Sequence, residues 1–487
     1  MEDDRHTLFR QDSDLDLSFT SCTTTTTTTS ARSSLARSSL CLSFNESTVG
    51  RNNNNSSPTS TAVPNLHSRP HRKSDPNWAA INAATNLSSD GTLHLRHLKL
   101  VRLVGSGNLG RVFLCRLRDY EHASFAIKVV DNNLLTSKKL SHVQTEGRIL
   151  SSLDHPFLPT LYAHLEASHY TCFLIDFCPN GDLHSLLRKQ PNYRLPIDSV
   201  RFYAAEVLVA LEYLHSLGIV YRDLKPENIL IRDDGHIMLS DFDLCFSSDV
   251  VPKLDHTRSR KHRRSRRRSR CGCYGSYRSA AAEEEEMVTE FVAEPTTAFS
   301  KSCVGTHEYL APELVNGSGH GNGVDWWAFG VLVYELLYGR TPFRGGSKES
   351  TLRNIASSRD VAFEEEEDEI LLLGEIAGME EAKDLINKLL VKDHRRRLGC
   401  ARGATDIKRH PFFDGIKWPL IRTYSPPELR GVTVKRSGRA HVSHVSSPSK
   451  RRRWIWKGLN YLLMKSKGSK RNLNFNQNYY CYSKHVV

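Results

Sequence analysis

The pattern of hydrophobic and polar positions becomes regular only from about residue 98. Short apolar runs rich in β-branched and aromatic residues predict strands at 111–117, 124–130 and 170–177, and one helical stretch is predicted at 143–153. From Asp182 onward the apolar residues recur at spacings of three and four, which indicates helices. The pattern therefore predicts an α+β chain with a β-rich small lobe over about 98–178 and a mainly α large lobe over about 179–413.

The segments outside this pattern have a different composition. Residues 1–97 are rich in Ser, Thr and Asn and cannot bury enough apolar surface to fold, so a disordered tail is expected. Within it, the repeat ARSSLARSSL at 31–40 is either low-complexity sequence or a pair of arginine-directed phosphorylation sites. A basic run and an acidic run fall within about 248–298, which is expected to be a disordered insertion. A C-terminal tail covers 414–487 and contains a basic, aromatic segment at 450–471.

Charge and cysteine content indicate the kind of partner and the cellular compartment of the protein. The formal net charge of +13 in 487 residues favours an anionic partner such as a phospholipid surface, nucleic acid or acidic protein. The eleven cysteines lack CxxC pairs, so neither a disulfide framework nor a zinc cluster is indicated, and a reducing compartment follows. No apolar run approaches the roughly eighteen residues of a membrane span, and the acidic N-terminus is not a secretory signal.

A glycine-rich stretch, GSGNLGRV, lies between two predicted strands. Its glycines stand at 105, 107 and 110, a spacing that dinucleotide-binding sites share. In a dinucleotide site the last glycine opens a helix, whereas here it opens a predicted strand. The stretch is therefore interpreted as a flap over phosphates. Lys128 follows at the end of the next predicted strand, and Glu146 on the helical stretch is its candidate ion partner.

The segment YRDLKPENILI at 221–231 carries the strongest chemical signal. It combines Asp223, which can orient a hydroxyl, Lys225, which can neutralise a transferred phosphate, and Asn228, which can bind Mg²⁺. The triplet Asp-Phe-Asp begins at Asp241, thirteen residues after Asn228. Two carboxylates in this spacing could form a metal-binding pair of the kind found in sugar-nucleotide transferases. Alternatively, Asp243 replaces a glycine of a different motif.

These motifs, in this order, resemble the eukaryotic protein kinase family over about residues 98–413. In that resemblance Asp241 matches the metal-binding aspartate of Asp-Phe-Gly, and Asp243 is a substitution of the glycine, tolerated because Asp can adopt left-handed backbone conformations. Tyr221 before Arg-Asp is typical of AGC kinases, and Lys225 is typical of serine/threonine kinases. The stretches VGTHEYLAPE at 304–313 and DWWAFG at 325–330, together with Arg397 as partner of Glu313, match the large-lobe framework.

The long insertion and the Asp-Phe-Asp variant resemble plant AGC group VIII kinases, and DLDLSFTS, ARSSLARSSL and HYTCFLIDFCPNGDLHSLLRKQPN bring the match to the PINOID/WAG branch. The resemblance implies a bilobal protein kinase fold that uses ATP and Mg²⁺. It implies the catalytic residues Asp223, Lys225, Lys128 and Glu146 and the metal ligands Asn228 and Asp241. Around ATP it implies Gly105, Gly107, Gly110, Val112, Lys128, Asp176, Cys178 and Asp182, with adenine on the backbone of 176–178.

The resemblance also implies what the enzyme recognises. Substrates are expected to carry Arg near the acceptor, with Asp182, Glu227, Glu335 and Thr306 in substrate recognition. Ser302 matches the activation-loop phosphorylation site, where its phosphate would pair with Arg222 and an upstream kinase could act. PIN auxin-efflux carriers are the implied protein substrates, with control of carrier polarity in auxin signalling. A monomer is expected.

Two other functions compete with that of an active kinase. A catalytically silent scaffold usually lacks the equivalents of Lys128, Asp223 or Asp241, and all three are present. A basic nucleic-acid-binding protein is disfavoured because the arginine-rich run has no interleaved aromatics and no zinc-finger pattern, so no specific nucleic acid is expected. The run at 258–270, followed by Cys271 and Cys273, predicts attachment to anionic lipids at the plasma membrane periphery, besides a cytoplasmic pool. Nuclear import is the alternative.

Overall fold

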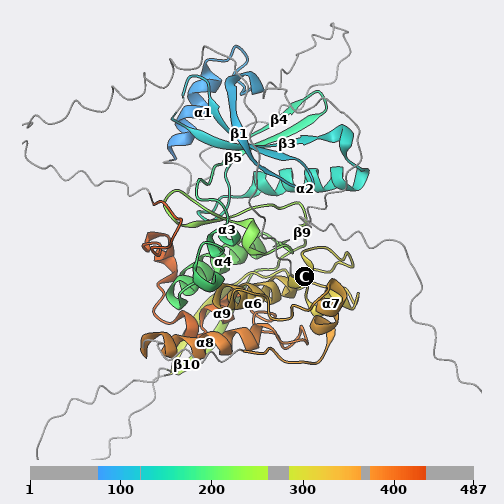
Figure 1. The fold of residues 1–487 in the computed structure, drawn as a ribbon, viewed down its shortest axis with the longest axis vertical. Helices are drawn as coiled ribbons and strands as arrows, with labels where there is room; N and C mark the ends of the chain where they lie inside the picture. The colour runs from blue at the N-terminus through green and yellow to red at the C-terminus, as the bar shows by residue number, and fades with distance from the viewer. Residues whose placement is uncertain (1–74, 121, 261–284, 364–372, 435–487) are drawn as a thin grey trace, which may run out of the picture. The chain divides into compact units, whose positions relative to one another are not determined.

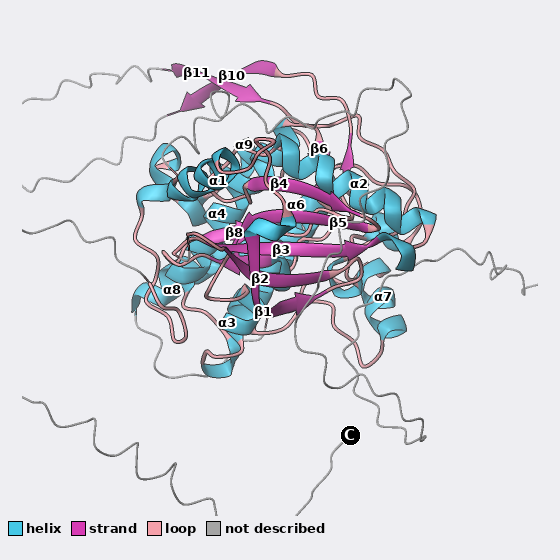
Figure 2. Cartoon of the chain, turned by 90° about the horizontal axis from the view of Figure 1, so that it is seen from above, coloured by secondary structure: helices cyan, strands magenta, loops and turns pink. Residues whose placement is uncertain are grey.

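The computed structural model of the chain describes residues 75–120, 122–260, 285–363 and 373–434 (Figure 1). The small lobe is built on an antiparallel five-stranded sheet in the order β1-β2-β3-β5-β4 (Figure 2). Its strands are β1 Leu98–Ser106, β2 Arg111–Leu117, β3 Ser124–Asp131, β4 Leu161–Ala167 and β5 Tyr170–Asp176. The helical stretch predicted at 143–153 belongs to α2, Ser137–Ser152, which Thr136 caps. The predicted β-rich small lobe is present.

The small lobe begins before residue 98, contrary to the expectation of a disordered tail over 1–97. Helix α1, Pro76–Asn86, starts at the N-cap Asp75 and has Pro at its first position. Trp78, Ile81 and Ala84 recur at a spacing of three and are buried in one cluster with residues of the sheet. The sequence SDPNWAAINAA contains this cap and this spacing, which are typical of a helix. The polar composition of the residues before it led to the expectation of disorder for the whole segment. Residues 1–74, with the serine repeat, lie outside the described residues.

The large lobe is mainly helical, as predicted. Its helices are α3 Leu183–Leu187, α4 Ile197–Ser216, α5 Pro312–Val315, α6 Gly323–Tyr338, α7 Lys348–Ala356, α8 Leu373–Leu389 and α9 Ala404–Lys408. Short antiparallel pairs join β6 Ile219–Val220 to β9 Phe246–Ser247, and β7 Ile229–Ile231 to β8 Ile237–Leu239. Helix α6 is apolar on nearly all sides, which is typical of a helix in the middle of a core.

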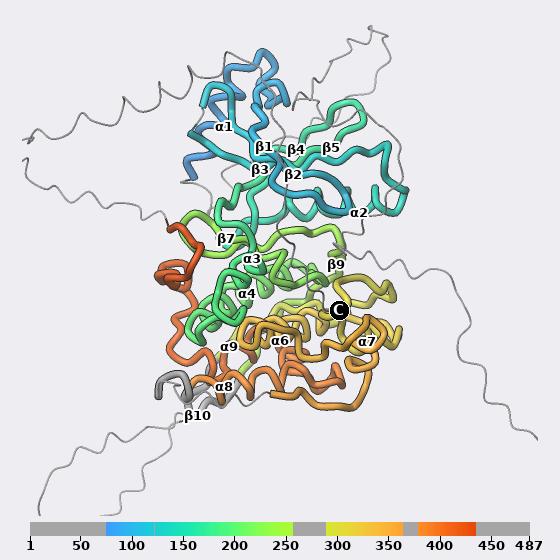
Figure 3. The backbone as a smooth tube through the Cα atoms, viewed as in Figure 1, coloured from blue at the N-terminus to red at the C-terminus, as the bar shows by residue number. Residues whose placement is uncertain are grey.

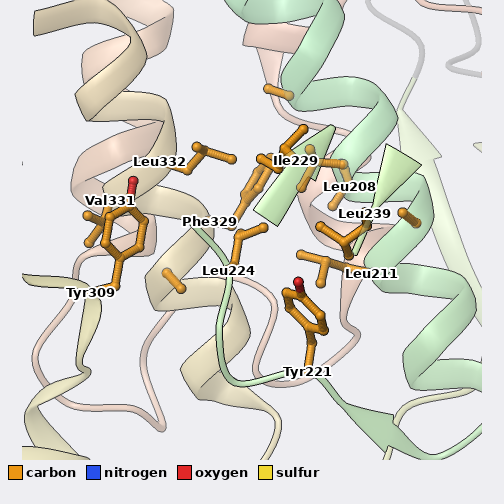
Figure 4. Packing of buried hydrophobic residues seen from close by; sticks show 14 of the residues in the cluster. Leu208, Leu211, Tyr221, Leu224, Ile229, Leu239, Tyr309, Phe329, Val331 and Leu332 are labelled. Atoms are coloured by element: carbon orange, nitrogen blue, oxygen red, sulfur yellow. The ribbon is translucent and has the colours of Figure 1, made fainter. Parts of the chain in front are cut away.

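The loop at 221–228, which contains Asp223, Lys225 and Asn228, is fixed to this core by its own apolar residues. Tyr221 and Leu224 are 0% and 1% exposed, and they lie among core side chains of α4, α6 and the β7–β8 pair (Figure 4). The polar residues beside these anchors, Asp223 and Lys225, contact each other instead of the apolar side chains of the core. The core therefore sets the position of the loop.

The insertion at 248–298 is ordered at both ends, which corrects the expectation of disorder over its whole length. Strands β10, Lys253–Arg260, and β11, Glu285–Val292, pair in antiparallel register. Arg402 holds this hairpin to the large lobe through ion pairs with Asp255 and Glu290, and Val292 is buried. These contacts come from residues more than a hundred positions apart, which composition alone cannot reveal. Residues 261–284, with most of the basic run, lie outside the described residues.

The segment after Asp414 follows the large lobe back toward the junction of the lobes. It contains the 3₁₀ turn Trp418–Thr423, in which Arg422 pairs with Asp234 of the turn after β7 (Figure 3). The Asn180 amide bonds both the nitrogen and the oxygen of the Thr433 backbone, at 3.0 and 3.2 Å. The segment at 450–471 is not among the described residues. No described helix combines the length and apolar character needed to cross a bilayer.

Candidate active site

The glycine-rich stretch forms the turn between β1 and β2, so its last glycine does open a strand as predicted. The Gly107 nitrogen donates to the Gly110 oxygen at 2.9 Å across the turn. A Cβ at Gly110 would lie 2.3 Å from the Val129 carbonyl oxygen, so this position requires glycine. A Cβ at Gly105 or Gly107 would meet nothing within 4 Å, which leaves open space beside the turn.

Lys128 lies within β3, three residues before its end, and opposite Val112 in the β2–β3 register. Its Nζ is 2.7 and 2.8 Å from the two carboxylate oxygens of Glu146 and 3.1 Å from Oδ1 of Asp241. Burial alone would lower the pKa of Lys128, but the carboxylates of Asp241 and Glu146 raise it above its ordinary value. The anticipated pair with Glu146 is present, and Lys128 joins the small lobe to the Asp-Phe-Asp segment.

Asp223 is the centre of a compact polar group on the large lobe. Its Oδ2 accepts from Lys225 Nζ at 2.8 Å and from the Asn228 amide nitrogen at 2.9 Å, and its Oδ1 accepts from the Thr306 hydroxyl at 3.2 Å. Lys225 also donates to Thr306 at 3.0 Å. The nitrogen end of the Asn228 amide is thus turned to Asp223, and its oxygen end is the group that suits a hard cation. Together these contacts bring four predicted site residues into one group.

A buried carboxylate holds the loop that carries Asp223. The two oxygens of Asp325 accept from the backbone nitrogens of Tyr221 and Arg222 at 2.8 and 2.7 Å. Arg222 has a positive φ of 68°, a conformation that costs a non-glycine residue free energy and needs such support. The predicted Glu313–Arg397 pair, at 2.7 and 2.9 Å, lies in the same lobe.

The two carboxylates of the Asp-Phe-Asp segment, Asp241 and Asp243, differ in backbone conformation and in their contacts. Asp241 contacts Lys128, has a φ of 60° and keeps a side chain that is 42% exposed. Asp243 has no positive φ, so the expected left-handed conformation at this position is wrong; Asp241 adopts it instead. Burial, followed by repulsion from Asp241, raises the pKa of Asp243 to about 7. The two carboxylates therefore lie in different surroundings, and Asp241 is the one that contacts Lys128.

Arg222 connects the catalytic loop to the segment at 300–306. Its Nη1 lies 2.7 Å from the Ser302 hydroxyl and 3.3 Å from the Ser300 hydroxyl, and its Nε donates to the Leu244 oxygen at 2.6 Å. The guanidinium that was expected to meet a phosphate on Ser302 is therefore already beside that hydroxyl.

Three acidic residues expected to meet substrate arginines lie at the edge of the same site. Asp182 caps α3 by accepting from the Ser185 nitrogen at 2.7 Å, so its carboxylate has a structural task as well. Glu227 is half-exposed and lies 3.4 Å from His184. Glu335 accepts from the Tyr309 hydroxyl. Burial raises the pKa of Glu335 to about 7, and repulsion from Glu227 adds to the shift, which places these two carboxylates near each other.

The residues expected around adenine are at the junction of the lobes. Asp176 ends β5, and its carboxylate accepts from the Thr160 nitrogen at 2.7 Å. Its side chain is therefore engaged within the small lobe, and any contact with adenine would be made by its backbone. Cys178 is buried, with its Sγ 3.9 Å from Met238 Sδ. Both positions are compatible with the expected backbone role.

A buried triad beneath the catalytic loop was not anticipated. His215 on α4 is 2.8 Å from Glu294 through Nδ1 and 2.9 Å from Asp325 through Nε2, and all three side chains are at most 4% exposed. Burial alone would lower the pKa of His215, but the two carboxylates raise it to about 10. Glu294 follows β11, so the triad connects the insertion to the residue that holds the catalytic loop. No local motif in the sequence marks this contact.

Comparison with known proteins agrees with this arrangement. The protein kinase domain family model matches residues 98–259 and 287–413. Serine/threonine-protein kinase WAG1 of Arabidopsis thaliana is 63% identical over 491 residues, covering 99% of both chains. Serine/threonine-protein kinase WAG2 of the same plant is 61% identical and covers 97% of this chain and 96% of that protein. Protein kinase PINOID of Oryza sativa subsp. japonica is 48% identical over 74% of this chain and 75% of its own length.

Proposed function

Because the chain belongs to the protein kinase family, in the PINOID/WAG branch of plant AGC group VIII serine/threonine kinases, we propose that it phosphorylates PIN auxin-efflux carriers. In this proposal the acceptors are Ser or Thr near Arg, and phosphorylation controls carrier polarity in auxin signalling. The observation that carries the catalytic part is the presence of two polar groups: Lys128 with Glu146 and Asp241, and Asp223 with Lys225, Asn228 and Thr306. The PIN substrate rests on the family resemblance.

The nucleotide would lie between the lobes. Backbone amides near Gly105, Gly107 and Gly110 cover its phosphates, and Lys128, oriented by Glu146, contacts the α and β oxygens. Adenine meets the backbone of 176–178, with Val112 against the base and Asp182 near the ribose. The open space beside Gly105 and Gly107 supports this placement.

A divalent cation, most commonly Mg²⁺ in this family, fits the donor set of Asn228 and Asp241. The Asn228 amide turns its nitrogen to Asp223, and the Asp241 carboxylate is partly exposed, so both positions offer the oxygen ligands that Mg²⁺ prefers. When bound, the cation neutralises charge on the phosphates.

Asp223 accepts or orients the proton of the substrate hydroxyl, and Lys225 stabilises the charge on the transferred phosphoryl group. In the structure the Thr306 hydroxyl is 3.2 Å from Asp223 Oδ1 and 3.0 Å from Lys225 Nζ. A hydroxyl at this place has the two contacts that an acceptor Ser or Thr would need. Thr306 therefore also helps to define where the acceptor lies.

Substrate arginines would pair with Asp182, Glu227 and Glu335. The planar guanidinium suits bidentate contact with carboxylates, and the half-exposed Glu227 is the most accessible of the three. Phosphorylation of Ser302, by this enzyme or by an upstream kinase, would add a doubly charged group next to Arg222 and so order the segment at 300–306.

The PIN proposal is tested with the purified cytoplasmic loop of a PIN carrier, Mg-ATP and the full-length chain. We expect phosphoserine or phosphothreonine in the loop at sites with Arg upstream, located by mass spectrometry. A loop in which those arginines are replaced by alanine is the control and should lose most of the incorporation. Phosphorylation of an Arg-containing peptide without any modification of the loop would contradict the PIN assignment while leaving kinase activity intact.

We also place the enzyme at the periphery of the plasma membrane. The run at 258–270 has nine Arg or Lys residues by sequence, and each contributes on the order of 1 kcal/mol near an anionic leaflet. The hairpin β10–β11, in which the run begins, is held beside α9 by the ion pairs of Glu290 with Arg402 and Arg409. Acylation of Cys271 and Cys273 would provide the second attachment signal.

Replacing the arginines of 258–270 by alanine in a fluorescent fusion is expected to move the protein from the plasma membrane to the cytoplasm in plant cells. The physical reason is the loss of electrostatic attraction to anionic lipids. A fusion with the same number of lysines in place of those arginines keeps the charge and should remain at the membrane. Unchanged membrane signal with loss of nuclear signal would identify the run as an import sequence instead.

A further inference from the structure

Helix α1 lies outside the residues that match the family model, yet its first turn reaches the junction of the lobes. The N-cap Asp75 accepts from the Asn77 nitrogen through Oδ1 at 3.0 Å and from the Tyr162 hydroxyl through Oδ2 at 2.7 Å. Trp78 packs on Tyr162 with ring centroids 5.2 Å apart, and both side chains are almost fully buried. The start of α1 is therefore fixed against one tyrosine of β4.

The same tyrosine hydroxyl contacts the residue that begins the expected adenine-binding segment. Tyr162 Oη is 2.9 Å from Oδ1 of Asp176, whose other oxygen accepts from the Thr160 nitrogen at 2.7 Å. Tyr162 and Asp176 are 1% and 6% exposed, so water cannot substitute freely for either partner. One hydroxyl hydrogen is thus shared between two carboxylates, the partly buried Asp75 at the start of α1 and the buried Asp176 at the end of β5.

The contacts continue into the large lobe. Arg232, which follows β7, brings Nη2 to 3.4 Å from Asp176 Oδ1, and its carbonyl accepts from the Asn180 amide at 2.7 Å. The positive guanidinium balances part of the charge of the two carboxylates. Segment 176–180 is consequently held from one side by Tyr162 and from the other by Arg232.

We propose that α1 positions the nucleotide site, acting through the chain Asp75–Tyr162–Asp176. The contacts fix the side chain of Asp176, and with it the backbone of 176–178 that would meet adenine, an inference that rests on the nucleotide placement given above. Without the hydroxyl, Asp75 and Asp176 lose the donor that they share. The Asn77 amide, 3.3 Å from Tyr162 Oη, and Arg232 remain nearby, but the side chain of Asp176 is held less firmly, so this backbone can shift. The three residues are positioning residues, since none of them touches the reacting atoms.

The test uses the full-length chain carrying Tyr162→Phe, which keeps the ring packing on Trp78. We expect the KM for ATP to rise about 3- to 10-fold while kcat at saturating ATP stays within about twofold, because only binding of the nucleotide is affected. The matched control is Ile81→Val, which removes one methyl group from the buried face of the same helix. It should lower the melting temperature without changing the KM for ATP.

A lower melting temperature for Tyr162→Phe with an unchanged KM for ATP would overturn the proposal and leave α1 a packing element. If Tyr162→Phe does not fold, Asp75→Asn replaces it, because Asn caps helices as well as Asp does. Its expected effect is about a 2- to 3-fold rise in the KM for ATP, and an unchanged value would equally overturn the proposal. Failure of the underlying nucleotide placement would appear separately, as absent ATP binding in the wild-type chain.

Discussion

Replacing Asp223 by Asn is expected to lower kcat about 10³-fold, which corresponds to about 4 kcal/mol of transition-state stabilisation. Asparagine has the same shape and can keep the contact with Lys225 or Asn228, but it cannot accept the proton of the acceptor hydroxyl. The Lys128–Glu146 pair lies in the other lobe and is unaffected, so nucleotide binding should persist. Turnover on a serine peptide and the thermal shift produced by Mg-ADP measure the two properties separately.

The matched control for this change is Asp198→Asn. Asp198 lies in the first turn of α4 in the same lobe, and its side chain is 86% exposed, so the same chemical substitution should leave turnover within about twofold. Retention of more than about a tenth of the wild-type kcat by Asp223→Asn would show that another group handles the proton. Loss of Mg-ADP binding in that variant would point to misfolding of the loop.

The second large effect is expected for Glu294→Ala. The substitution removes one of the two carboxylates that contact the buried His215 and leaves its charge half-compensated, and breaking such a buried pair costs about 3 kcal/mol or more. Because Asp325 shares His215 and also holds the backbone of Tyr221 and Arg222, catalytic turnover should fall together with stability. Urea unfolding and peptide phosphorylation measure the two consequences.

The control for this change is Glu290→Ala in the same hairpin. Glu290 pairs with Arg402 and Arg409 in a partly exposed setting, where an ion pair contributes only about 0–1 kcal/mol.

The pH dependence of stability gives an additional check on the buried triad. Since the folded state raises the pKa of His215 from about 6.5 to about 10, its stabilising contribution is complete below pH 6.5 and declines as the pH rises toward 10. The stability difference between wild type and Glu294→Ala should shrink over that range, and a difference that stays constant would contradict the charged triad.

The sequence was sufficient for those parts of the site that are defined by short spacing. Asp223, Lys225 and Asn228 fall within six residues on one loop, so their proximity in the fold follows from their proximity in the chain. Lys128 and Asp241 are 113 positions apart, and only the family resemblance brought them together. The strands predicted at 111–117, 124–130 and 170–177 and the helical character of the large lobe followed from apolar patterning, because their apolar residues are buried in two hydrophobic clusters.

What could not be predicted depends on contacts between distant segments with no motif of their own. Glu294 belongs to a stretch whose composition suggests disorder, and only its contact with His215, 79 positions away, reveals its place. The same holds for Asp75, which reaches Tyr162 across 87 positions. Asp243 is a different case. Its backbone conformation could not be deduced, because a local sequence does not determine which of two neighbouring aspartates takes the positive φ.

The central claim is transfer of a phosphoryl group from ATP to a hydroxyl chosen by nearby arginine, and a pair of serine peptides tests it most directly. One peptide carries Arg at the second and third positions before Ser, and the other carries Ala there. With the full-length chain and Mg-ATP, we expect phosphoserine in the first peptide and a kcat/KM at least about 10-fold lower for the second, since a charge-assisted hydrogen bond contributes about 1.5–3 kcal/mol. Equal rates for the two peptides would contradict the arginine-directed site, and no transfer to either would contradict kinase activity itself.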